Sequence, residues 1–166
     1  MRMNSLFALL AAAVLAVVLS TKSNLHAQNL RDDRLDDRRT APAREVRVSA
    51  ILISAFNGEG ETDPRLAGYE NNLRRSLRFE KFGYLGEGSV RIAMPGDAPI
   101  RLPGGQTVEV EAAHYGEGVV WLRVIWMDGE RQFMNVVYSK WPLGKAIVVG
   151  GLAKEGRNLA IILTPR

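Results

Sequence analysis

Cysteine is absent from this chain of 166 residues. Its absence excludes disulfide bonds, thiolate metal centres, a thiol nucleophile and a lipid-modified N-terminal cysteine. Histidine is almost as scarce, because only His26 and His114 occur. A lone histidine without cysteine or carboxylates at ligand spacing disfavours a zinc centre. We therefore expect His114 to lie in a turn or on the surface, and we predict no metal and no cofactor.

The usual motifs of catalytic loops are missing as well. No serine lies in a Gly-x-Ser-x-Gly turn, and no glycine-rich segment has the pattern of a phosphate-binding or dinucleotide-binding loop. We expect the glycine-rich segments to be turns. Carboxylates on separate strands can still converge on a glycan or cell-wall substrate without any sequence signature. The candidates for such a small hydrolase are Glu109, Glu111, Glu117, Asp128 and Glu130.

Residues 1–27 have the pattern of a secretory signal peptide. Arg2 precedes an apolar run over residues 6–19, which is shorter than the ~20 residues that a membrane span needs. We place cleavage after Ala27. Leu25 occupies the −3 position, where a small residue is usual, so an uncleaved signal anchor is the alternative. The prediction is a periplasmic or secreted protein that touches the membrane only if the signal is retained.

Residues 28–45 change in composition to a charged flexible linker. Aspartate and arginine dominate this segment, and large apolar residues are nearly absent, so it cannot bury a core. Once Arg2 and Lys22 leave with the signal, 20 basic residues stand against 18 acidic ones. So small an excess of positive charge disfavours nucleic acid as a partner.

Residues 46–166 form the predicted β-rich domain. Its first segment, 46–56, alternates and then becomes continuously apolar, which predicts a strand that ends buried on both faces. Asp63 followed by Pro64 predicts a helix N-cap, and we expect the helix to run to about Arg78. One apolar stripe of this helix comprises Leu66, Tyr69, Leu73 and Leu77.

After Gly83 the pattern changes to short alternating segments separated by glycine or proline. Hairpins are expected at Asp128-Gly129 with a type I′ turn, across residues 103–105 and across residues 150–158. The fold class is therefore mostly β (α+β): an antiparallel β meander or sandwich with one amphipathic helix on a face or across an open end. The predicted strands are 89–94, 100–102, 106–112, 119–127, 132–139, 146–149 and 159–164.

Basic and aromatic residues gather on the helix and at its exit. An exposed polar helix face, with the aromatic side chains packed into the core, is the first interpretation. A contact site for an acidic glycan, a lipid headgroup or an acidic protein segment is the second. The candidate partner-binding residues are Arg74, Arg75, Arg78, Lys81, Phe82 and Tyr84.

Several short segments follow one another in a characteristic order. They are Ala50 to Ala55, Asp63 to Leu66, Leu73 to Phe82, Leu102 to Gly105, and Val149 to Gly151 followed by Leu159 to Ile162. In this order the chain resembles a group of exported bacterial proteins of unknown function over most of residues 46–166. The resemblance implies a small β-rich fold and no known activity, substrate or catalytic residue.

The sequence thus favours a non-catalytic exported envelope protein. We expect a binding or assembly module that contacts another envelope protein, an acidic glycan or a lipid headgroup. The contact would use a strand edge or the basic-aromatic helix region. Two alternatives stay open: the small hydrolase described above, and a small-ligand carrier whose sheet closes around an apolar cavity.

Overall fold

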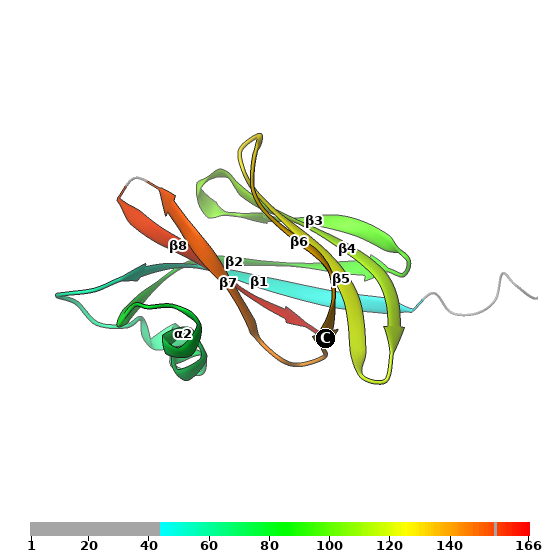
Figure 1. Cartoon of the computed structure of the whole chain (residues 1–166), viewed down its shortest axis with the longest axis horizontal. Helices are drawn as coiled ribbons and strands as arrows, with labels where there is room; N and C mark the ends of the chain where they lie inside the picture. Colours follow the sequence, from blue (N-terminus) through cyan, green and yellow to red (C-terminus); the bar gives the residue numbers. More distant parts are fainter. Residues whose placement is uncertain (1–43, 155) are drawn as a thin grey trace, which may run out of the picture. The chain divides into compact units, whose positions relative to one another are not determined.

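Two four-stranded antiparallel sheets make up most of residues 44–154 and 156–166, the part of the chain described by this computed structural model (Figure 1). Sheet A has the order β2-β1-β8-β7 and sheet B the order β3-β4-β5-β6. The predicted β-rich α+β fold is confirmed. The strands are β1 (Glu45–Phe56), β2 (Lys81–Ala93), β3 (Gly96–Leu102), β4 (Gln106–Gly116), β5 (Val119–Asp128), β6 (Arg131–Pro142), β7 (Ile147–Lys154) and β8 (Arg157–Pro165).

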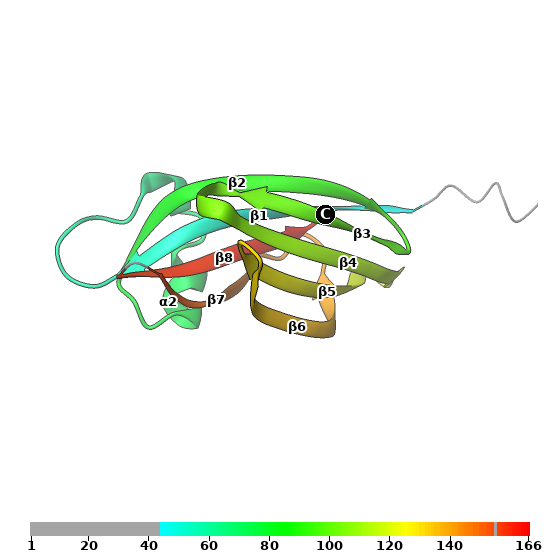
Figure 2. The same cartoon turned by 90° about the horizontal axis from the view of Figure 1, so that it is seen from above.

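The main hydrophobic core lies between the two sheets. Successive side chains of a strand point to opposite faces, so every second residue of β1 faces sheet B. Val46, Val48, Ala50 and Leu52 occupy these positions and are buried. Figure 2 shows the consecutive strands of sheet B side by side, and their inward residues complete the core. These residues include Val108, Val110, Ala112, Val120, Leu122, Val124 and Trp126.

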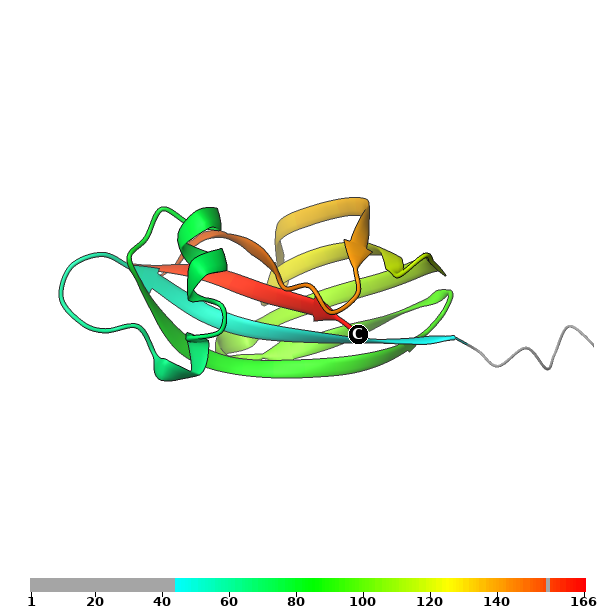
Figure 3. The ribbon, with the colours of Figure 1, turned by 90° about the horizontal axis from the view of Figure 1, so that it is seen from below.

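A second, smaller core lies on the opposite face of sheet A, beneath the helix. Leu66 and Leu73 are fully buried there against Ile53, Phe82 and Ile162. Ile53 follows Leu52 directly, and both are buried, so β1 is covered on both faces near its end, as the sequence predicts. Figures 1 and 2 place sheet B and the helix toward opposite ends of sheet A, and Figure 3 shows the helix, in green, crossing β1 and β8.

The prediction of one continuous helix over residues 64–78 is wrong. The structure has a 3-10 turn, η1 (Pro64–Leu66), and a separate short α-helix, α2 (Glu70–Ser76). Gly68 lies between them, and glycine disfavours helix by about 1 kcal/mol relative to alanine. The predicted N-cap does form, because the Asp63 carboxylate accepts a hydrogen bond of 3.0 Å from the Arg65 amide. The apolar stripe still faces the sheet, with Tyr69 and Leu77 half-buried.

All three predicted hairpins form, but one of them has a different turn type. Asp128 pairs with Arg131, so Gly129 and Glu130 are the central residues of the β5–β6 turn. Only Gly129 has a positive φ, at 60°, which is the pattern of a type II′ turn rather than the predicted type I′ turn. Asp128 is the last residue of β5, and its side chain accepts hydrogen bonds from Gln106 and Lys154. The β3–β4 turn contains the 3-10 segment η2 (Pro103–Gly105).

Strand boundaries differ from the predicted ones chiefly in β2. This strand begins at Lys81, eight residues before the predicted Ser89, because it pairs with the whole length of β1. Glu45 is already paired with Ala93, so the first strand includes the last residue of the predicted linker. Within residues 44–154 and 156–166, no helix has the length and apolar character that crossing a membrane requires. The predicted signal peptide and residues 28–43 of the predicted linker lie outside the described part.

Candidate functional site

The basic-aromatic helix region does not form one continuous surface. Phe82 is fully buried in the core under α2, so its side chain packs the fold and reaches no partner. Tyr84 is half-buried, and the Arg65 guanidinium covers its ring at 3.9 Å from the centroid. Arg74 binds Glu70 at 2.7 Å within the helix. Of the other predicted site residues, Lys81 is half-buried at the start of β2, and two are exposed: Arg75 and Arg78.

The five candidate carboxylates do not meet in one pocket. Glu109 and Glu111 lie on the outer face of β4 beside Asp97, where the sheet has a shallow depression of about 410 Å³. Glu111 pairs with Arg123 at 3.5 Å and raises the pKa of the neighbouring Tyr138 phenol. Glu117 lies in the β4–β5 turn, whereas Asp128 and Glu130 lie at the β5–β6 turn, at the opposite end of β5.

A buried polar chain closes one end of the main core. The Gln106 side chain is 2% exposed, and its amide oxygen accepts a 2.7 Å hydrogen bond from the Trp126 indole N–H. Its amide nitrogen donates to Asp128 Oδ1 at 2.6 Å, and Lys154 Nζ donates to the same oxygen at 2.6 Å. These donors lower the pKa of the Asp128 carboxyl, the Lys154 ammonium contributing most. These hydrogen-bonded side chains thus link the β3–β4 turn to the β5–β6 and β7–β8 hairpins.

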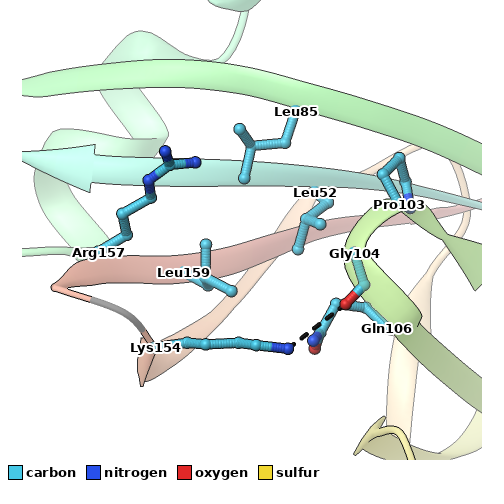
Figure 4. Close-up of a pocket in the computed structure, with 8 residues that line it drawn as sticks. All are labelled: Leu52, Leu85, Pro103, Gly104, Gln106, Lys154, Arg157 and Leu159. Carbon is cyan, nitrogen blue, oxygen red and sulfur yellow. Dashed lines mark hydrogen bonds between the residues drawn. The ribbon is translucent and has the colours of Figure 1, made fainter.

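Next to this polar chain lies a pocket of about 270 Å³ (Figure 4). Its apolar wall consists of Leu52, Leu85 and Leu159, which project from the inner face of sheet A at the edge of sheet B. Figure 4 shows Lys154 and Arg157 on either side of Leu159, with the Lys154 ammonium 3.4 Å from the Gly104 carbonyl oxygen. The other lining residues are Pro103 and Gln106.

The β6 edge is the second prominent feature. β6 pairs with β5 alone, so along twelve residues its outer backbone groups have no strand partner in the described part of the chain. The register is irregular opposite Arg123: Leu122 pairs with Ser139 and Val124 with Val136, and between them lie two residues of β6. These two, Val137 and Tyr138, are 73% and 40% exposed, whereas the other large apolar side chains that the structure describes are buried or half-buried. A β-bulge re-aims side chains in this way.

Sequence reasoning missed the residues of both features. The sequence pattern predicts only that Gln106 begins a strand and that Arg157 lies in a hairpin turn, because periodicity does not reveal which strand ends meet. Nor does alternation reveal a bulge, because the extra residue is visible only against the partner strand. One feature of the sequence could have indicated Gln106: in the alternating pattern of its strand, this polar residue lies on the same face as the apolar Val108 and Val110.

Comparison of the chain with protein-family models, curated proteins and solved structures finds no match. Among residues 44–154 and 156–166, no three histidine or carboxylate side chains lie close enough together to hold a metal ion. The resemblance to exported proteins stays a prediction. Function is therefore inferred from the pocket and the β6 edge themselves.

Proposed function

We propose that this chain is a non-catalytic binding module of the cell envelope, which docks an extended segment of another protein on the β6 edge. The observation that carries the proposal is the coincidence of an unpaired strand edge with the exposed Val137 and Tyr138. An unpaired edge offers backbone donors and acceptors to an added strand, and exposed apolar side chains give such a contact its anchor. The predicted signal at residues 1–27 supports an exported location.

The two ends of β6 indicate the chemistry of the partner. Arg131 begins the strand, and Lys140 near its end lies over the Trp121 ring at 5.4 Å. Positive charge on both sides of Val137 and Tyr138 favours a partner segment with an apolar centre and acidic flanks. Lysine and bulges on an edge also hinder indiscriminate pairing with other strands, which fits a specific contact.

The bulges also limit how the partner can pair. β6 departs from regular pairing at Phe133 and again at Val137 and Tyr138, so its regular stretches are short and cover residues 134–136 and 139–142. A partner strand would therefore form only a few backbone hydrogen bonds on each side of the second bulge, and the side chains at that bulge would supply much of the contact. Binding should therefore depend most on Val137, the most exposed of these side chains.

The test is photo-crosslinking in cells with a photoreactive phenylalanine placed at position 135, which is exposed on β6 beside Val137, and as a matched control at the exposed helix position 75. We expect one discrete crosslinked product from position 135, carrying a second protein and reduced by Val137→Asp. A product from position 75 but not from 135 would transfer the site to the helix. A product of twice the chain mass would show self-association, and no product at 135 would reject the edge.

The intact mass of the same purified protein tests the predicted export. Cleavage after Ala27 leaves a chain that begins at Gln28, and the mass distinguishes it from the full chain. The full mass in a membrane fraction would instead support the signal anchor, and the full mass in the cytoplasm would contradict an envelope location.

A further inference from the structure

We infer that the pocket between the sheets binds a small organic acid: a carboxylate with a compact apolar tail. This ligand site is independent of the proposed partner contact, because it rests on residues of the inner face of sheet A rather than on Val137 and Tyr138. Its elements are an apolar wall, a cation at the rim and a fixed polar side.

The apolar wall arises because sheet A continues beyond sheet B. Leu52 and Leu159 belong to the core between the sheets, and each also borders the pocket, with Leu85 of β2 completing the wall. Within the described residues, Pro103 is the only other apolar side chain that lines this pocket. Leu52 and Leu159 are themselves buried and Leu85 is half-buried, so a ligand placed here would remove from water mainly the surface of Leu85 and of its own apolar tail. The volume of about 270 Å³ is at the small end for a small-molecule site, which favours a short acid over a long-chain lipid.

The sign of the charge at the rim selects an anion. Lys154 is already paired with Asp128 at 2.6 Å, so these two charges compensate one another. Arg157 is exposed at the rim and makes no hydrogen bond or ion pair with any residue of 44–154 or 156–166. A guanidinium in this position can bind a carboxylate through two parallel hydrogen bonds, and this paired contact fixes the orientation of the ligand.

The polar side of the pocket is fixed before any ligand arrives. Gln106 is held at both ends, by Trp126 and by Asp128, and Lys154 reaches the Gly104 carbonyl oxygen at 3.4 Å. The β3–β4 turn packs closely against sheet A. Pro103 of this turn lies so near Gly86 of β2 that a Cβ added to Gly86 would be 2.5 Å from the proline ring. A preformed wall lowers the ordering cost of binding.

Octanoate is the probe, and 1-octanol is its uncharged counterpart with the same tail. Titration of the protein is followed by NMR of leucine methyl groups. We expect octanoate to shift the signals of Leu52, Leu85 and Leu159, and Arg157→Gln to weaken its binding roughly tenfold or more, the loss expected for a bidentate charged contact. Binding of 1-octanol should change little between the wild type and this variant.

The matched control is Arg91→Gln, which removes an exposed arginine toward the other end of β2. Arg157 is itself exposed, so neither variant should alter the fold, and thermal unfolding checks this. The inference is overturned if octanoate at millimolar concentration leaves the three leucines unshifted. It is equally overturned if Arg91→Gln weakens binding as much as Arg157→Gln, because general charge attraction would then explain the effect.

Discussion

Replacing Gln106 by methionine should destabilise the domain by about 2 kcal/mol. Methionine matches the length of glutamine but has no amide, so the buried Trp126 indole N–H loses its only acceptor. An orphaned buried donor costs about 1–3 kcal/mol. Asp128 loses one donor but keeps Lys154, and its side chain is 25% exposed, so water can replace the missing contact. The loss at Trp126 should therefore account for most of the effect.

Urea unfolding followed by circular dichroism measures this difference, and Gln132→Met is the matched control because Gln132 is exposed on β6. We expect the control to stay within about 0.5 kcal/mol of the wild type. A double-mutant cycle with Trp126→Phe should give a coupling energy of about 1 kcal/mol or more, since the two side chains share one hydrogen bond. The reasoning is refuted if Gln106→Met is as stable as the control, or if the two substitutions add without coupling.

Two further predictions concern the turn contact and the N-cap. Gly86→Ala should cost about 1–3 kcal/mol, because the added Cβ would lie 2.5 Å from Pro103 Cγ, a rigid ring atom; a urea midpoint equal to that of the wild type would contradict this. The hydrogen bonds from Arg65 lower the pKa of Asp63 to about 2 from its ordinary 3.8. A depressed pKa stabilises the folded state above pH ~4, and this stability is lost as pH falls toward 2. The stability difference between the wild type and Asp63→Asn should therefore shrink over that interval, and unfolding curves that keep a constant difference from pH 5 to pH 2 would refute it.

Much of the fold was predictable because one face of each strand is buried and the other is not. Period-two alternation marks β1, β4 and β5 clearly, since their inward residues are apolar and fill the core between the sheets. The Asp63 cap was predictable for a different, local reason: aspartate is a favoured N-cap residue, and proline is favoured at the first helical position. The sequence does not predict the break of the helix, because the apolar stripe continues across Gly68 and masks the interruption.

The candidate sites were less predictable because they depend on which strands meet. The hydrogen-bond partners of the Gln106 side chain, Trp126 and Asp128, lie on the neighbouring strand β5, and neither is close to Gln106 in sequence. Arg157 becomes a rim residue only because the β7–β8 hairpin ends beside the β3–β4 turn. The exposure of Val137 depends on the register between β5 and β6, and no single-strand pattern reports a register.

The central position of β8 in sheet A has a consequence for how the domain folds. β8 lies between β1 and β7, and Ser49 of β1 contacts Thr164 at a sequence separation of 115 residues. Bringing such distant segments together is entropically costly and slow, whereas the hairpins of sheet B need only short loops. We expect sheet B to form first and sheet A last. During that interval the apolar second half of β1 lacks its β8 neighbour, so residues 50–56 present an unpaired apolar strand edge, which is a template for aggregation.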